Sequence, residues 1–137
     1  MDNLGEARKI ATLMDGDDRV KAFLIIGLLS GDDNDFSSAI KELPKVLKGS
    51  VFHVLFVTVN ALTFVGKLEQ AHKLILSDSL KNNLEDEEKD QTLKIVVQSY
   101  LDKGDIKTAV QIAEEFSTDK VRADVWRTIA MACFKKA

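Results

Sequence analysis

The sequence contains few of the residues on which disulfide-rich and strand-rich proteins depend. Its 137 residues include one cysteine, one proline, one tryptophan and one tyrosine. A single cysteine, Cys133, cannot form an internal disulfide, which favours a reducing compartment and predicts a cytoplasmic protein. Scarce aromatic residues and turn formers disfavour a β-sandwich, whose strands and hairpins need both. We therefore expect an all-α fold.

Long apolar runs and a strong net charge are also absent. The most apolar stretch, residues 51–65, contains His53 and Asn60 and is shorter than the roughly 20 residues that a bilayer requires. The opening MDNLGEARKI has no basic region followed by an apolar run, so it predicts no secretory signal. A net charge of −3 disfavours binding to nucleic acid or to an anionic membrane.

An internal repeat is the clearest positive signal. Four copies share an alanine three residues after a bulky aliphatic or aromatic residue, at Ala7, Ala39, Ala71 and Ala109. The alanines are separated by 32, 32 and 38 residues, which is in the range of helical repeat proteins. We expect a single domain over residues 1–137, with repeat units at about 4–34, 35–66, 67–104 and 105–137.

Each unit is predicted to hold a short helix followed by a longer one, which gives about eight antiparallel helices. The longer helices are expected near residues 18–30, 50–65, 87–103 and 119–136. Three of them are followed by a glycine that favours a left-handed helix end, at Gly31, Gly66 and Gly104.

Two places depart from this regularity. Pro44 removes a backbone donor, so the second short helix should kink or end near Leu43. The six additional residues of the third unit fall between Ser77 and Asp90, where the sequence is polar and charged. We expect a mobile, solvent-facing loop there, with its acidic end favouring the start of the next helix.

The segment YLDKGDIKTA, residues 100–109, resembles the turn of a tetratricopeptide repeat, with an aromatic residue, a glycine and a small residue at the family's spacing. The same spacing recurs at Leu62, Gly66 and Ala71. Other landmarks of the family are missing, and pentatricopeptide and other α-solenoid repeats remain alternatives. The resemblance implies an α-α superhelix of stacked hairpins that binds a peptide or protein on its concave face.

The apolar helix near residues 51–65 is the first candidate for a binding surface. Burial on all sides is the ordinary interpretation of such a helix, but four of its residues share one stripe at helical spacing. By the resemblance, this type of helix lines the groove, and Gly27 would lie beside it on the preceding long helix. The candidate partner-binding residues are His53, Phe56, Asn60, Thr63, Phe23, Lys94, Gln98 and Leu101.

Metal sites are not indicated by the sequence. His53 and His72 fall on different predicted helices, and neither has a second ligand one turn away. The acidic segments at residues 15–18 and 32–35 resemble calcium loops only superficially. After Asp32 and Asn34, the next expected oxygen ligand is Phe36 and the expected bidentate glutamate is Leu43. We interpret them as helix caps and solvated turns, and we expect no metal and no cofactor.

Catalytic motifs are also not recognisable. The sequence has no nucleophile next to a base, no carboxylate pair in an apolar setting and no phosphate-binding glycine loop. Cys133 shares an apolar face with Ile129, which predicts a buried structural thiol, and Trp126 is predicted to lie in the core. We therefore do not expect an enzyme.

The sequence predicts a protein-interaction module, either an adaptor or a small chaperone, that binds a peptide or an amphipathic segment of a partner protein. The alternative is a structural, self-associating repeat protein or a fragment of a longer solenoid. In the family's phase the chain starts and stops within a hairpin unit, and terminal units need a polar outer face. The alternative therefore predicts a homo-oligomer formed through uncapped terminal helices.

Overall fold

The computed structural model describes residues 3–136, and all regular elements among them are helical, as predicted. Short and long helices alternate along the described chain. The short helices are α1 (Asn3–Thr12), α3 (Asp33–Glu42), α5 (Leu68–Ile75) and α8 (Ile106–Ala113). The long helices are α2 (Gly16–Ser30), α4 (Val51–Phe64), α7 (Asp86–Asp102) and α9 (Asp119–Lys136). One further turn of helix is α6 (Asp78–Lys81), and two 3₁₀ turns are η1 (Leu43–Lys45) and η2 (Lys48–Ser50).

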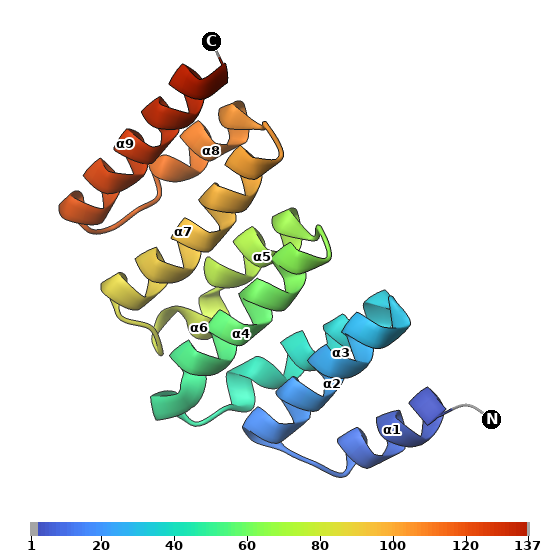
Figure 1. Ribbon diagram of the computed structural model, residues 1–137. Helices are drawn as coiled ribbons and strands as arrows, with labels where there is room; N and C mark the ends of the chain where they lie inside the picture. Colours follow the sequence, from blue (N-terminus) through green and yellow to red (C-terminus); the bar gives the residue numbers. More distant parts are fainter. Residues whose placement is uncertain (1–2, 137) are drawn as a thin grey trace.

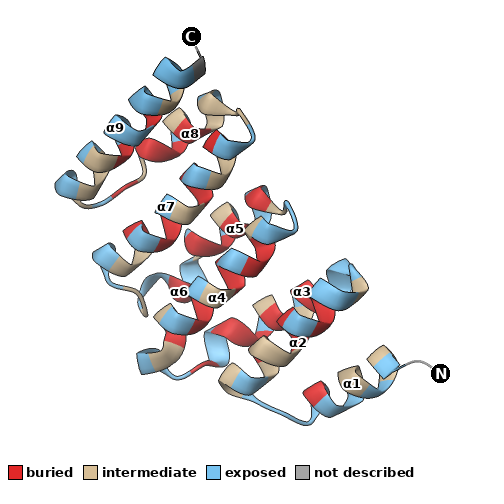
Figure 2. Cartoon of the chain, in the orientation of Figure 1, coloured by how far each residue is buried: buried red, intermediate tan, exposed pale blue. Residues whose placement is uncertain are grey.

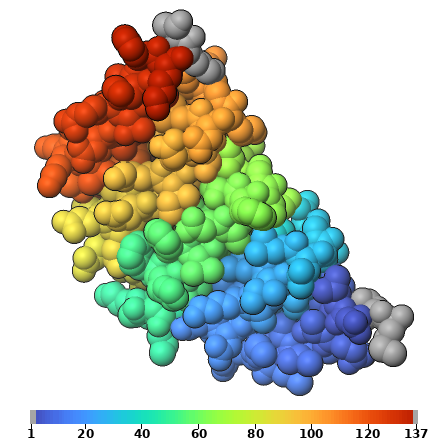
Figure 3. Space-filling view, in the orientation of Figure 1, coloured from blue at the N-terminus to red at the C-terminus, as the bar shows by residue number. Residues whose placement is uncertain are grey.

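The long helices lie side by side and run in the same direction (Figure 1). α2 contacts α4, α4 contacts α7, and α7 contacts α9, so these four helices form one layer. The short helices form the second layer and run in the opposite direction. The chain progresses from one end of the molecule to the other, with α1 and α9 at opposite ends (Figure 3).

The hydrophobic core runs between the two layers. Its buried side chains extend from Ala11 to Ile129 in one contiguous cluster, and Figure 2 shows them along the facing sides of the helices. Leu55 and Leu93, at equivalent positions of α4 and α7, are fully buried. Burial of one such side chain stabilises the fold by about 1.5 to 3 kcal/mol before the entropy of ordering it is subtracted.

The predicted helix ends are confirmed at the glycines and at the proline. Gly31, Gly66 and Gly104 have φ angles of 72°, 84° and 85°, in the left-handed region that residues with a β-carbon avoid. The short turns into α5 and α8 depend on the last two glycines. α3 ends at Glu42, and Pro44 lies in the 3₁₀ turn η1 that follows it.

The segment between α5 and α7 is more ordered than the sequence predicted. Leu80 in α6 is fully buried and belongs to the core cluster, and α6 contacts the 3₁₀ turn η1. α7 begins at Asp86, with a capping box formed by Glu85 and Glu88. The prediction of a solvent-facing loop throughout residues 77–90 is therefore wrong, because one apolar side chain anchors the inserted turn to the core.

A buried carboxylate links the first two repeat units. The Arg8 guanidinium donates two hydrogen bonds to Asp35, of 2.8 Å to Oδ1 and 2.9 Å to Oδ2. The Ser30 hydroxyl donates a third, of 2.7 Å. The hydrogen bonds from Arg8 hold the pKa of Asp35 below its ordinary value, against the opposing effect of burial.

A second buried carboxylate, Glu42, holds the start of α2 against the end of α3. Burial alone would raise the pKa of Glu42, but the Gly16 backbone N–H and the Arg19 guanidinium donate hydrogen bonds to its oxygens, of 3.1 and 3.2 Å. These bonds and the charges of Arg19 and Lys45 outweigh burial, so the pKa of Glu42 is lowered.

Acid is expected to destabilise the first two repeat units through these two carboxylates. Their ordinary pKa values are 3.8 and 4.5, and both are lowered in the folded protein. Their contribution to stability is therefore fully present above these ordinary pKa values, and it is lost as the pH falls below them and through the lowered pKa values of the folded protein. Urea unfolding midpoints measured between pH 7 and pH 3 test this expectation. Asp35→Asn should show a smaller loss on acidification, and equal losses in both proteins would contradict the assignment.

Candidate binding face

The outward side of α4 carries most of the predicted stripe. His53, Phe56 and Asn60 are exposed. Thr63 is half-buried, and its hydroxyl donates to the backbone oxygen of Asn60. The stripe instead continues to Phe64, whose side chain is 85% exposed. Three of the four residues predicted on α4 therefore share one open surface.

The predicted residues on the neighbouring helices divide into exposed and buried ones. Lys94 and Gln98 on α7 are exposed, whereas Leu101 is buried in the core. Phe23 on α2 is also buried, and it does not contribute to an open surface.

Phe23 is buried because α3 packs closely against its side of α2. Gly27 is buried, and a β-carbon at this position would lie 3.0 Å from the ring of Phe36 on α3. The side of α2 that carries Phe23 and Gly27 therefore faces the short-helix layer. The exposed apolar residues of α2 lie on its other side and include Ile25 and Leu29.

Equivalent positions of the long helices are exposed in the same way. The stripe on α4 is repeated 38 residues later on α7 and a further 32 residues later on α9, and counting back from the turn glycines places Ile25 and Leu29 on the same side of α2. We call this set the long-helix face. It consists of Ile25 and Leu29; His53, Phe56, Asn60 and Phe64; Gln91, Lys94, Gln98 and Asp102; and Ala123, Trp126, Ala130 and Phe134.

The long-helix face is apolar on both sides and polar in the middle. α2 contributes Ile25 and Leu29, and α4 contributes Phe56 and Phe64 beside the polar His53 and Asn60. α9 contributes Trp126 and Phe134, the latter 81% exposed. Between them, α7 presents only polar residues, of which Gln98 donates a hydrogen bond of 2.9 Å to Asp102. On α4, the ring of Phe56 packs edge-on against Phe52, with centroids 6.1 Å apart. This contact restricts the orientation of the Phe56 ring before any partner binds.

Two predictions on α9 are wrong. Cys133 is exposed and not buried, and Trp126 lies on the long-helix face, outside the core. The buried side of α9, marked by Val125 and Ile129, packs on α7 and α8 and is narrower than the apolar pattern of the sequence suggested. The remaining apolar residues of α9 therefore stay on the surface.

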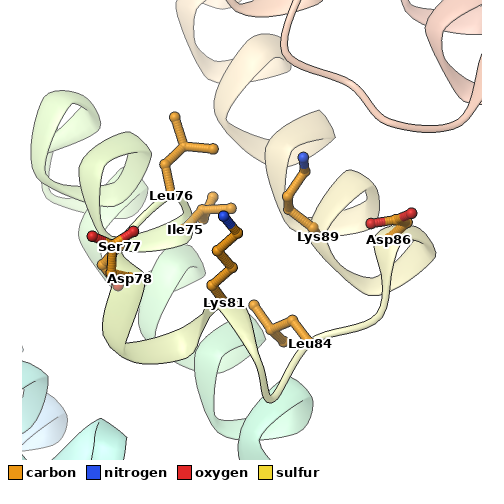
Figure 4. A pocket seen from close by; sticks show the side chains of 8 residues that line it. All are labelled: Ile75, Leu76, Ser77, Asp78, Lys81, Leu84, Asp86 and Lys89. Carbon is orange, nitrogen blue, oxygen red and sulfur yellow. The ribbon is translucent and has the colours of Figure 1, made fainter.

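A pocket between α5, α6 and α7 is too small to be the main site. Its volume is about 210 Å³, below the roughly 300 to 1,000 Å³ of typical ligand pockets. Figure 4 shows Lys81 and Lys89 on either side of it, and the Lys89 ammonium donates to the Ser117 hydroxyl, 2.6 Å away. Asp78 and Asp86 also line it, so it has no strong preference for an anion or a cation.

Metal ligands are not gathered in the part of the chain that the structure describes. No three His, Cys, Asp or Glu side chains there are placed to hold a metal ion. His53 lies on the long-helix face, whereas His72 pairs with Glu115 across α5 and the end of α8. The two histidines are therefore not brought together.

Comparisons with known proteins do not assign a family. No family model, curated protein or solved structure matches the chain. Among residues 3–136, no helix has both the length and the apolar character needed to cross a membrane. The long-helix face is thus the feature of this molecule from which its function is best inferred.

Proposed function

We propose that this protein is an interaction module, acting as an adaptor or small chaperone, that holds an amphipathic segment of a partner protein on the long-helix face. The observation that carries this proposal is the exposure of large apolar side chains at equivalent positions of the long helices. They are Ile25, Leu29, Phe56, Phe64, Trp126 and Phe134. Single exposed apolar residues are common on soluble proteins, whereas a set gathered on one face is typical of an interaction surface.

The arrangement of apolar and polar side chains across the long-helix face indicates which kind of partner it would bind. A segment that crosses the long helices meets apolar side chains on α2 and α4, polar ones on α7 and an aromatic pair on α9. Its own apolar residues would therefore contact Phe56 and Phe64, and its polar groups would face Lys94 and Asp102. An amphipathic helix provides such an arrangement on one side.

The proposal also includes a tetratricopeptide-like fold, which is inferred from the helical repeat. The alternation of short and long helices and the left-handed glycines at Gly66 and Gly104 support a tetratricopeptide-like stack. In this proposal the chain has no catalytic role and works in the cytoplasm, where the exposed thiol of Cys133 stays reduced.

The proposal is tested with short amphipathic peptides selected from a displayed library on the wild-type protein. Phe56→Ala and Phe64→Ala, combined, are expected to weaken binding of the selected peptides by about thirtyfold, the effect of losing an aromatic anchor worth about 2 kcal/mol. Fluorescence anisotropy with labelled peptides measures this loss.

The matched control is Leu47→Ala, because Leu47 is 79% exposed but lies outside the long-helix face. It should leave affinity unchanged, and all variants should retain the helical circular dichroism of the wild type. Equal affinity of the double variant and the wild type would refute the assignment of this face.

A further inference from the structure

A pocket lies between α7, the start of α8 and α9, beside the long-helix face. Its volume is about 330 Å³, within the roughly 300 to 1,000 Å³ of typical ligand pockets. The apolar residues that line it include Leu101 of α7, Ile106 of α8 and Met131 of α9. Gln98 and Asp102 also line it, and both belong to the long-helix face. This α7–α9 pocket is therefore continuous with the surface on which the partner segment is proposed to bind.

The preceding repeat unit shows which group occupies the equivalent place. Residues of α7 that correspond to those of α9 lie 32 residues earlier, so Tyr100 is the counterpart of Ala132, which lines the pocket. Tyr100 is half-buried and packs against the core. Burial and the charges of Glu69 and Asp105 raise its pKa, so its hydroxyl lies near the start of α5. In that unit, an aromatic ring therefore packs beside the start of the neighbouring short helix.

The α7–α9 pocket has no such ring at the corresponding place. Ala132 carries a single methyl group where Tyr100 carries a phenol. Ile106, the first residue of α8, is half-buried, whereas its counterpart Leu68, the first residue of α5, is 4% exposed. Met131 is 56% exposed and does not close the pocket. The space beside Ile106 is therefore suited to an aromatic side chain from another molecule.

The polar residues of the pocket suit a ring that carries a hydroxyl group. Asp102 and Thr128 can accept a hydrogen bond, and Lys135 can donate one. All three side chains are exposed, so they lie where the pocket opens to solvent. A tyrosine side chain combines a large apolar ring with one hydroxyl and loses little conformational entropy on binding. It therefore matches both the apolar and the polar residues that line the pocket.

We propose that the α7–α9 pocket binds a tyrosine side chain of the partner segment that is held on the long-helix face. This inference rests on the proposed function, because it concerns the same bound segment. The ring lies beside Ile106 as the ring of Tyr100 lies beside the start of α5, and its hydroxyl reaches the polar residues at the opening. The tyrosine thereby fixes the position of the segment relative to α7 and α9, while Phe56 and Phe64 contact it further along the face.

Ala132→Tyr tests this assignment, because it places in the pocket the residue that the preceding unit has. The peptides selected on the wild type are expected to contain a tyrosine, and Ala132→Tyr should weaken their binding by about tenfold, since its ring occupies the same space. Peptides in which that tyrosine is replaced by alanine should bind the wild type and the variant equally. Cys133→Tyr is the control, because it adds the same ring at an exposed position that does not line the pocket, and it should leave the affinity unchanged.

A titration of the wild-type protein with p-cresol, which is the side chain of tyrosine as a free molecule, tests the pocket without any peptide. Millimolar p-cresol should cause saturable shifts of the methyl NMR signals of Ile106 and Met131, because both residues line the pocket. The signal of Ile10, which is exposed on α1, should not shift. The same titration of Ala132→Tyr should give no saturable shift at Ile106.

The two measurements separate a failure of this inference from a failure of the proposed function. Absence of saturable p-cresol shifts, or equal affinity of the selected peptides for the wild type and Ala132→Tyr, would overturn the assignment of the pocket. A loss of peptide binding in the Phe56→Ala and Phe64→Ala double variant would then still support the long-helix face. A library that yields no binding peptide would refute the proposed function, and p-cresol would still decide whether the pocket accepts a tyrosine ring.

Discussion

Replacing Phe36 with alanine is expected to lower the free energy of unfolding by about 3 to 5 kcal/mol, as large-to-small changes in a core do. The Phe36 ring is 1% exposed and lies directly against the backbone of Gly27 on α2. The Lys67 ammonium lies 5.8 Å from the centre of the same ring. The ring therefore joins α3 to α2 and to the turn before α5, and its loss leaves a cavity where these elements meet. Urea denaturation followed by circular dichroism measures the effect.

A double-mutant cycle with Gly27 identifies the contact responsible. In the wild type, Gly27→Ala places a β-carbon 3.0 Å from the Phe36 ring, so it should destabilise the protein by about 1 to 3 kcal/mol. In the Phe36→Ala background the ring is absent, and the same change should be neutral or stabilising, because alanine favours helix over glycine by about 1 kcal/mol. Additive effects of the two substitutions would show that the two helices do not meet through this ring.

Much of the fold was predictable because its signals are local or periodic. The helical pattern, the glycines after the long helices and Pro44 after α3 each act within a few residues, and the structure confirms their effects. The burial of Leu80 was not predictable in this way, because a single leucine within a polar segment gives no periodic signal. Only the position of α6 against η1 shows that this side chain is needed by the core.

The long-helix face was predictable only in part, because helical spacing identifies residues that share a stripe but does not show which side of the helix is exposed. His53, Phe56 and Asn60 followed from helical spacing, whereas Phe23 and Leu101 were assigned to the wrong side of their helices. Projecting the repeat spacing of 38 and 32 residues from Phe56 reaches Lys94 and then Trp126, so the repeat itself held the missing signal. On α2 the projection depends on which turn residues are aligned, and the packing of Gly27 on α3 decides it.

Asp90 is a buried polar residue whose hydrogen-bond partners lie in a distant part of the chain. It lies in α7 and is fully buried, and its carboxylate accepts hydrogen bonds from the backbone N–H groups of Ser117 and Thr118, of 3.0 and 2.8 Å. These residues precede α9, and the Arg122 guanidinium in the first turns of α9 donates to the backbone oxygen of Phe116. Asp90 therefore fixes the point at which the chain enters α9.

Asp90→Ala is expected to lower the free energy of unfolding by about 3 kcal/mol, since two backbone donors lose a charged acceptor. The loss should be concentrated in α9, because α9 is attached mainly through α7 and α8. Hydrogen exchange should accelerate in α9 while the amides of α2 and α4 keep their protection. The fluorescence of Trp126, the single tryptophan, should shift as α9 loosens.

The control is Glu87→Ala, an exposed substitution on α7, the helix that carries Asp90. It should change the free energy of unfolding by no more than about 0.5 kcal/mol. Because α9 carries Trp126 and Phe134 of the long-helix face, Asp90→Ala should also weaken binding of the selected peptides. Unchanged protection of α9 would mean that its packing on α7 and α8 holds this helix in place without the hydrogen bonds of Asp90.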